Sequence, residues 1–486
     1  MAELNHEPLT CGEIPAEDRP SLGTALLPVV CMVLFLGVGA GVFGMDPHMP
    51  LVWSLVVTGL VAKFLIGKSW EEMYEGIVNG LVMGMQAILI LLIIYMLVAT
   101  WISAGTIPGL IYYGLSILTP AVFLPATALL SLLVAFTVGS SWTTAGTLGV
   151  AFIGIGIGLG MPEPMTAGAI LTGAYAGDKV SPLSDTTNLA AAVTSTDLYD
   201  HISAMRTGTT LAFAIAIVGY GILGLNAAGT IPADQIATIR EGILASYSVS
   251  PLVFLPLVIM FGLSIYGVPA VPALLAGVFA GVGTATLIQG VPLIEAWNIA
   301  QSGTNPSTGV EVVNGLLAAD GLLGSIWTVS IVVAALALGG LLDHSGVLAV
   351  LAHHLSRAIQ GVASLTVGTG GSAILMNALT ADQYMSIVGP SITFRPLYDE
   401  YDLESRNLSR AVEAAGTTTS ALIPWNSGGV YMTAVLGVPT LSYAPYYFFG
   451  FLSPLILFIM GITGWKITHR DPDTTEPAGE ATPVDD

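Results

Sequence analysis

The stretch GIVNGLVMGMQAILILLIIYMLVATWI, residues 76–102, indicates the fold class, because it contains no charged residue. A helix needs about 20 mostly apolar residues to cross a bilayer, so this run is long enough to span one. Similar apolar runs follow one another between residues 24 and 466. The chain is 54% hydrophobic and 9% charged, whereas soluble domains carry about 25% charged residues. We therefore predict an all-α polytopic membrane protein with about 10–13 transmembrane segments.

Acidic residues give the chain a formal net charge of −20, with 32 acids against 12 bases. Many of them lie in an N-terminal tail (1–23) and a C-terminal tail (467–486). Hydrated carboxylates keep a surface soluble when salt screens their mutual repulsion, so the charge suits a high-salt cytoplasm. Acidic disordered tails without salt adaptation are the alternative explanation. So acidic a chain is not expected to bind nucleic acid.

Short landmarks recur in the same order in two parts of the chain. The first is a small-residue turn between apolar helices, the second a glycine-rich string and the third a polar cluster with a proline. They pair Gly105 with Gly346, Gly139 with Gly368, and Ser181 with Ser420. Asn188 then matches Ser427, or Asn426 after a one-residue gap. Such duplication is typical of secondary transporters.

We therefore predict two inverted repeats and divide the chain accordingly. The first membrane half covers 24–228, a linker region with two spans covers 229–300, and the second half covers 301–466. Broken helices near mid-membrane are expected in both repeats, because transporters of this kind build their substrate sites there.

Two kinds of interruption are predicted within the apolar runs. The strings VGSSWTT (138–144) and VGTGGS (367–372) indicate tips of re-entrant hairpins, whose residues are Gly139, Ser140, Ser141, Thr143, Gly368, Thr369 and Ser372. SPLSDTTN (181–188) and LIPWNSGG (422–429) indicate broken helices, since each places a proline and polar residues between apolar flanks. Irregular backbone at membrane depth must line a cavity or be buried in protein.

Asp185 is the strongest candidate for ion exchange. An acidic residue in a membrane is costly, by about 2.5–3.5 kcal/mol on insertion scales, and it requires a reason. Na⁺ is a hard cation that favours oxygen ligands, and a carboxylate can hold Na⁺ or a proton but not both well. Asp185 also suits a helix cap, and the two roles are compatible. The predicted ion and proton ligands are Asp185, Asp178, Ser181, Ser184, Thr186, Thr187, Asn188, Ser420, Asn426, Ser427 and Asp382.

The other charged residues leave alternatives open. Asp178 and Lys179 form an interfacial ion pair or a Lys179–Asp185 bridge, or Asp178 is a second ion carboxylate with Lys179 as internal competitor. Asp382 follows the second glycine string and either takes part in transport or ends a helix in water. The charged segment 392–416 is predicted to be a solvated cytoplasmic loop.

Three segments resemble the NhaC-type Na⁺/H⁺ antiporters of the ion-transporter superfamily. They are SWEEMYEGIVNGLVMGMQAILILLIIYMLVATWISAGTIPGLIYYG (69–114), GAYAGDKVSPLSDTTNLAAAVTSTDLYDHI (173–202) and ALIPWNSGGVYMTAVLGVPTLSYAPYYFF (421–449). The resemblance implies exchange of Na⁺ for H⁺ across the plasma membrane, by a homodimer whose transport domain moves against a scaffold. It also implies Na⁺ ligands at the hairpin tips, here matched loosely by Ser140, Ser141, Thr143, Thr369 and Ser372.

Carriers of organic cargo belong to the same superfamily, so a second function stays open. Exchange of amino acids, such as arginine for ornithine, or of organic acids, such as malate for lactate, would use the same scaffold. The sequence contains no P-loop and no nucleophile–base pattern, which argues against an ATP-driven pump and against an enzyme. We expect no cofactor. The expected partners are membrane lipid and the transported Na⁺ and H⁺, or a small amino or organic acid.

Overall fold

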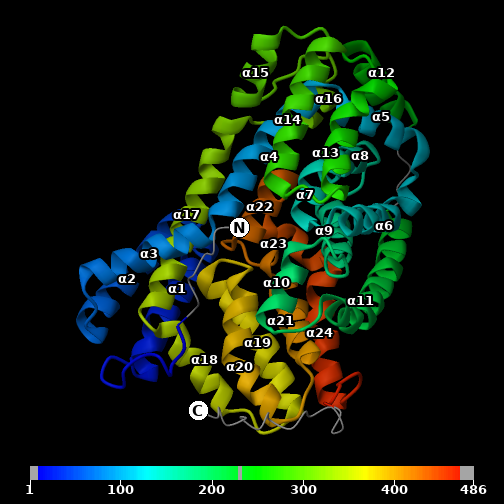
Figure 1. Cartoon of the computed structure of the whole chain (residues 1–486). Helices are drawn as coiled ribbons and strands as arrows, with labels where there is room; N and C mark the ends of the chain where they lie inside the picture. Colours follow the sequence, from blue (N-terminus) through cyan, green and yellow to red (C-terminus); the bar gives the residue numbers. More distant parts are fainter. Residues whose placement is uncertain (1–8, 228–232, 471–486) are drawn as a thin grey trace, which may run out of the picture.

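The computed structural model describes residues 9–227 and 233–470 of the chain (Figure 1). Within these residues the protein is built of helices, with two isolated β-bridges and no strand. Nine of the described helices are long and apolar enough to cross a membrane, and two bent helix pairs raise the total to 11. The protein is therefore an all-α polytopic membrane protein. Parts of both predicted acidic tails (1–8 and 471–486) lie outside the described residues.

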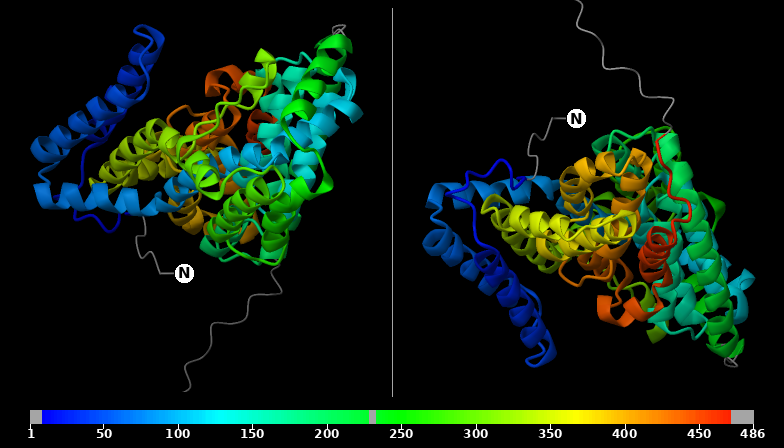
Figure 2. Two further views of the ribbon diagram at one scale, coloured as in Figure 1. Left: turned by 90° about the horizontal axis from the view of Figure 1, so that it is seen from above. Right: turned by 90° about the horizontal axis from the view of Figure 1, so that it is seen from below.

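The N-terminal helices form an arm at one side of the molecule, seen clearly from above and below (Figure 2). Ser69 and Glu72 start the last of them with a capping box, in which each side chain accepts the other residue's backbone N–H. The Ser69 N–H lowers the pKa of the exposed Glu72 carboxyl to about 2. The arm comprises α1 (Leu22–Gly41), α2 (His48–Val61), η1 (Ala62–Ile66) and α3 (Trp70–Met83).

A first series of helices follows the arm and contains two breaks. The first break is at Gly139, whose φ of 71° is a left-handed conformation that glycine adopts without strain. The second separates α9 from α10. The series comprises α4 (Met85–Ser103), α5 (Thr106–Ile117), α6 (Pro120–Val138), α7 (Ser141–Thr144), η2 (Ala145–Gly149), α8 (Val150–Gly158), α9 (Glu163–Asp178), α10 (Asp185–Val193) and α11 (Leu198–Ala227).

A set of connecting helices lies opposite the arm and packs on the first series (Figures 1 and 2). Within it, α12 and the helices after it bend by 89° at a short break. The set comprises α12 (Ala233–Ser246), η3 (Pro251–Phe254), α13 (Leu255–Ile265), α14 (Ala270–Leu287), α15 (Leu293–Ser302), α16 (Glu311–Leu316) and η4 (Leu322–Ser325).

A second series repeats the element order of the first. Helices α4 and α17 both have 19 residues, as do α6 and α19, while α9 and α21 both have 16. Gly105 and Gly346, with φ of 79° and 77°, start α5 and α18. The series comprises α17 (Ile326–His344), α18 (Val347–Arg357), α19 (Val362–Thr380), α20 (Met385–Glu400), α21 (Ser405–Ser420), α22 (Ser427–Leu436), α23 (Thr440–Tyr443), η5 (Ala444–Tyr446) and α24 (Phe448–Thr463).

The predicted hairpin tip in the second series is wrong. Gly368, Thr369 and Ser372 lie inside the continuous helix α19, where Thr369 donates to the Leu365 carbonyl at 2.8 Å. Within the string, Gly370 permits close packing of helices, because a Cβ on it would come within 2.7 Å of Phe458 in α24. The break comes later, at Ala381, whose φ of 56° is left-handed like that of Gly139.

When the break at Ala381 is aligned with the break at Gly139, the helices of the two series begin at one constant spacing along the chain. The aligned helix starts are Pro120 and Val362, Glu163 and Ser405, and Asp185 and Ser427. The equal spacing supports the predicted duplication. The inverted orientation of the repeats, and the domain boundaries at 228 and 301, stay predictions.

Candidate functional site

The candidate site lies where two interrupted helices meet. In the first series α9 ends at Asp178 and α10 begins at Asp185; in the second α21 ends at Ser420 and α22 begins at Ser427. Each interruption frees the last carbonyls of one helix and the first N–H groups of the next, and these groups then need other partners.

Side chains cap the two helices that restart. The Ser184 hydroxyl accepts the Thr187 N–H of α10 at 3.3 Å, and the Asn426 amide oxygen accepts the Gly428 N–H of α22 at 2.8 Å. Ser184 and Asn426 therefore occupy equivalent positions. Asn188 donates locally, to the carbonyls of Pro182 and Ser184 at 2.9 and 2.6 Å. Its proposed matches, Asn426 and Ser427, are thus not its structural equivalents.

A matched pair of contacts links the breaks within each series. In the first, the Ser141 hydroxyl donates to Asp178 Oδ2 at 2.8 Å. In the second, the Ser420 hydroxyl donates to Gln383 Oε1 at 3.4 Å. In each series the contact joins the last residue of the helix before the second break, Asp178 or Ser420, to a residue just after the first break, Ser141 or Gln383. Across the series, the hydroxyls of Tyr175 and Ser420 lie 3.3 Å apart.

The two carboxylates of the first break have different surroundings. Asp178 is 2% exposed, and its Oδ1 has no hydrogen-bond partner among the described residues. Asp185 is exposed; its Oδ1 accepts the Thr186 N–H at 2.8 Å and its Oδ2 accepts the Tyr384 hydroxyl at 2.7 Å. Asp178 thus offers an enclosed oxygen, and Asp185 offers an accessible carboxylate.

Lys179 forms neither of its predicted ion pairs. Its ammonium lies 3.3 Å from Oε1 of Glu413 on α21, and both side chains are fully buried. The other carboxylate oxygen, Oε2, lies 2.6 Å from Nε2 of the buried His201 on α11. Asp178 and Asp185 remain within electrostatic range of Lys179. The lysine is therefore held on Glu413 beside the two aspartates.

The sequence does not identify Glu413 as a residue of the site. The prediction that segment 392–416 is a solvated cytoplasmic loop is wrong. Most of the segment belongs to α20 and α21, and Glu413 is buried. The sequence holds one signal: from Ala414 to Ser420 every residue is small and uncharged, as in the buried part of a helix. The neighbouring Arg406 and Arg410 concealed it.

The remaining polar residues of SPLSDTTN mostly hold the break together. The hydroxyls of Thr186 and Thr187 donate to Glu413 Oε1 at 3.2 and 3.1 Å. The Ser181 hydroxyl donates to the Phe136 carbonyl of α6 at 2.7 Å. At the hairpin tip, Ser140 accepts the Thr143 N–H at 3.1 Å and so caps α7.

The second broken helix satisfies the freed end of α19. The Asn426 amide donates to the Asn377 carbonyl at 2.9 Å, and the Trp425 indole donates to the Ala378 carbonyl at 2.8 Å. The Ser427 N–H donates to the Ala381 carbonyl at 2.8 Å. Asn426 also donates to the side-chain oxygen of Asn377 at 3.2 Å, whereas the buried Ser427 hydroxyl has no partner among the described residues.

Asp382 caps α20 and does not end a helix in water. It is 1% exposed, and its Oδ1 accepts the N–H groups of Tyr384 and Met385 at 2.8 and 3.0 Å. Since the Tyr384 hydroxyl also donates to Asp185, this tyrosine contacts acidic residues of both series.

A cavity of about 300 Å³ opens between α4, α8, α16 and α22. Apolar side chains such as Ile94, Val98 and Ile153 line it, together with the carboxylates of Glu163 and Asp320. Both acidic residues are exposed. The cavity combines an apolar wall with negative charge, which suits a cationic solute that has an apolar part.

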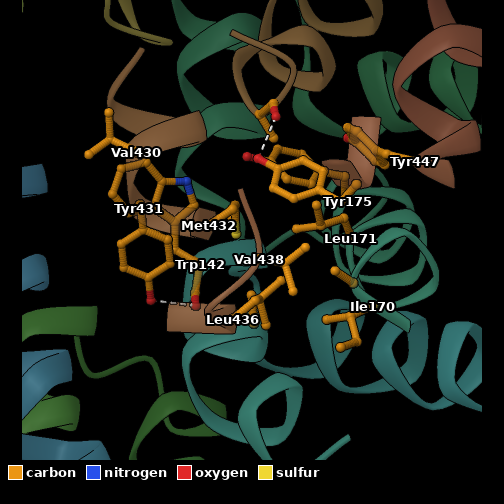
Figure 3. Close-up of a cluster of buried hydrophobic side chains, with 14 of the residues drawn as sticks. Trp142, Ile170, Leu171, Tyr175, Val430, Tyr431, Met432, Leu436, Val438 and Tyr447 are labelled. Carbon is orange, nitrogen blue, oxygen red and sulfur yellow. Dashed lines mark hydrogen bonds between the residues drawn. The ribbon is translucent and has the colours of Figure 1, made fainter. Parts of the chain in front are cut away.

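Trp142, Tyr175, Tyr431 and Leu436 belong to one cluster of buried hydrophobic side chains (Figure 3). Trp142 stacks on Tyr431 with ring centroids 4.3 Å apart, and the Tyr431 hydroxyl donates to the Trp142 carbonyl at 2.7 Å. Leu436 of this cluster lines the cavity, while the Tyr175 hydroxyl contacts Ser420.

Comparisons with known proteins agree on the kind of protein. The profile of the Na⁺/H⁺ antiporter family matches residues 21–187 and 173–465. The chain is 53% identical to the arginine/ornithine antiporter ArcD of Halobacterium salinarum over 97% of this chain and 98% of that protein. It is 35% identical to the Na⁺/H⁺ antiporter NhaC of Alkalihalophilus pseudofirmus, over 92% and 97%.

A third relative is the malate-2H⁺/Na⁺-lactate antiporter of Bacillus subtilis, with 34% identity over 94% of this chain and 96% of that protein. All three relatives carry the names of membrane antiporters and none the name of an enzyme. With its apolar helices, the protein is thus a multi-pass transporter of the cell membrane. The chain belongs to the Na⁺/H⁺ antiporter family.

Proposed function

We propose that the protein exchanges Na⁺ for H⁺ at the carboxylates of Asp178 and Asp185. The observation that carries the proposal is the unpartnered, buried Oδ1 of Asp178 beside a hydroxyl-rich helix break. A buried carboxylate oxygen without a donor is strongly disfavoured unless a proton or a cation occupies it. Both transported ions meet that requirement.

Exchange follows from competition for the same oxygens. Lys179 is a buried cation within electrostatic range of both aspartates, yet its ammonium pairs with Glu413 at 3.3 Å. Asp178 and Asp185 therefore take their positive charge from outside the protein, as H⁺ or as Na⁺. Since one ion must leave before the other binds, a gradient of either drives the other if only loaded states cross the membrane.

Vesicles containing the purified protein test the proposal. With an acidic interior and a pH-sensitive dye, added Na⁺ alone should dissipate the pH gradient. Dissipation that needs an amino acid or an organic acid as well as Na⁺ would overturn Na⁺/H⁺ exchange.

Replacing Asp185 by Asn gives the first prediction. Asn keeps the size of Asp and one of its two acceptor oxygens, but it is neutral and can neither hold H⁺ nor compensate Na⁺, so exchange should fall to the level of empty vesicles. The matched control is Asp200→Asn, an exposed acidic residue in the first turn of α11. Full exchange by a folded Asp185→Asn protein would remove this residue from the mechanism.

Arginine/ornithine exchange is the second candidate. Two observations favour it: the 53% identity to a relative of that name, and the cavity of about 300 Å³ with Glu163 and Asp320. Na⁺ alone needs no such volume, whereas the cationic side chain of a dibasic amino acid fits one. Uptake of labelled arginine into ornithine-loaded vesicles distinguishes the two functions, and Glu163→Gln should then raise the KM for arginine. The homodimer implied by the resemblance is likewise a proposal, which the mass of the purified complex can test.

A further inference from the structure

The break between α19 and α20 contains a second acidic residue with an unused oxygen. Asp382 is 1% exposed, and its Oδ1 accepts two backbone N–H groups of α20. Its Oδ2 has no hydrogen-bond partner among the described residues, and no basic side chain described pairs with it. One half of this buried carboxylate is thus satisfied and the other is not.

The surroundings of Asp382 favour a cation rather than an empty space. Asp382 lines a cavity of about 10 Å³, together with Thr380, Met385 and glycines of α3 and α17. That volume corresponds to about one water molecule or a single small ion. A Cβ on Gly339 would come within 2.5 Å of the Thr380 carbonyl oxygen, so this oxygen lies against the same wall.

The two helix ends provide opposite partial charges at this point. The N-terminus of α20, which has 16 residues, stabilises the Asp382 anion through its free N–H groups. The C-terminus of α19 directs its partial negative charge toward the break, as in broken helices that bind cations in transporters. Carboxylate, carbonyl and hydroxyl oxygens are the ligands that a hard monovalent cation prefers.

We propose that Asp382, with the carbonyl and hydroxyl oxygens of Thr380, forms a second Na⁺ site, separate from the one at Asp178 and Asp185. The inference rests on the proposed function for its choice of cation. Separate sites follow from the geometry, since the two carboxylates lie on different broken helices and Tyr384 stands between them.

Equilibrium binding of radioactive Na⁺ to the purified protein tests the inference. The unaltered protein should bind two Na⁺ per chain, Asp382→Asn one, and Asp185→Asn one. Asn is as good a helix cap as Asp, so Asp382→Asn should keep the fold, and the thermal unfolding midpoint verifies this. Val is similar to Thr in shape but lacks the hydroxyl, so Thr380→Val removes one proposed ligand and should weaken one of the two Na⁺-binding steps several-fold.

The possible outcomes separate the two proposals. Na⁺ binding that is unchanged in Asp382→Asn overturns the second site. If Asp382→Asn binds fewer Na⁺ per chain than the unaltered protein while Asp185→Asn binds as many, the Asp382 site stands. The same result contradicts the proposed function at Asp178 and Asp185. A protein that binds no Na⁺ overturns both.

Discussion

Glu413 is the residue on which the buried part of the site depends. Its carboxylate accepts hydrogen bonds from the hydroxyls of Thr186 and Thr187 and pairs with Lys179 and His201. These partners come from α10, α11 and the segment after α9, whereas Glu413 belongs to α21. A buried charge with this many partners is costly to disturb, because each partner would lose its counter-charge or its acceptor in a place without water.

Replacing Glu413 by Gln should destabilise the protein by about 3–5 kcal/mol, the usual cost of breaking a buried ion pair from one side. The freed Lys179 then competes with Na⁺ at the neighbouring aspartates, so the KM for Na⁺ should rise as well. Thermal unfolding and vesicle exchange measure the two effects.

A surface pair provides the matched control for this variant. Glu404 pairs with Arg406, and both side chains are partly exposed; Glu404→Gln should change stability by at most about 1 kcal/mol. The double variant Lys179→Met/Glu413→Leu removes both charges and should regain much of the stability. An unchanged KM for Na⁺ in a folded Glu413→Gln protein would show that Lys179 does not compete with the transported ion.

At the scale of the element, the break at Gly139 depends on the absence of a side chain. Its φ is 71°, and a Cβ there would lie 2.5 Å from the backbone carbon of Leu183 in the other break of the same series. Gly139 therefore permits both the left-handed turn and the contact between the two breaks.

Gly139→Ala should cost clearly more stability than Gly437→Ala. Gly437 ends α22 with a φ of 68°, yet a Cβ there would meet nothing within 4 Å. Its replacement should cost only the left-handed strain, about 1–2 kcal/mol, while Gly139→Ala adds the clash with Leu183. Unfolding midpoints of both variants in the same detergent measure the difference, and equal losses would contradict a role for the close approach.

The helix breaks show what the sequence predicts and what it does not. Proline and polar residues between apolar runs located the breaks after Asp178 and Ser420. Ala381 could not be found in this way, because alanine favours helices and its φ of 56° is unusual for it. Tertiary contacts fix that conformation, among them the Ser427 N–H to the Ala381 carbonyl. The glycines of VGTGGS did not mark a break, because glycine can also serve the close approach of two helices, as Gly370 does beside Phe458.

Pairings across the chain were equally hidden. Lys179 and Glu413 are 234 residues apart in the sequence, so no local pattern connects them. The all-α membrane fold could be predicted from the apolar runs, because the length and composition of each run are enough to indicate a membrane-spanning helix. The ion pair depends on how the two series of helices meet, which no single run contains.

At the scale of the whole molecule, the net charge of −20 predicts a dependence on salt. Raising the salt from about 0.1 M to about 1 M shortens the Debye length from about 10 Å to about 3 Å and so removes most repulsion between surface carboxylates. The unfolding midpoint should therefore rise with KCl over this range. A midpoint that is already maximal at low salt would contradict salt adaptation and leave acidic tails as the explanation.

Tyr384 gives the two carboxylate sites a shared residue. Its hydroxyl donates to Asp185 and its backbone N–H donates to Asp382. An ion that displaces the hydroxyl from Asp185 therefore acts on the segment that orients Asp382. Such an influence is a coupling free energy, and thermodynamic linkage makes it reciprocal: the factor by which occupancy at Asp185 changes affinity at Asp382 equals the factor in the other direction. If both carboxylates bind Na⁺ as proposed, their affinities are then coupled through a single tyrosine, whose phenol contacts one carboxylate and whose backbone N–H contacts the other.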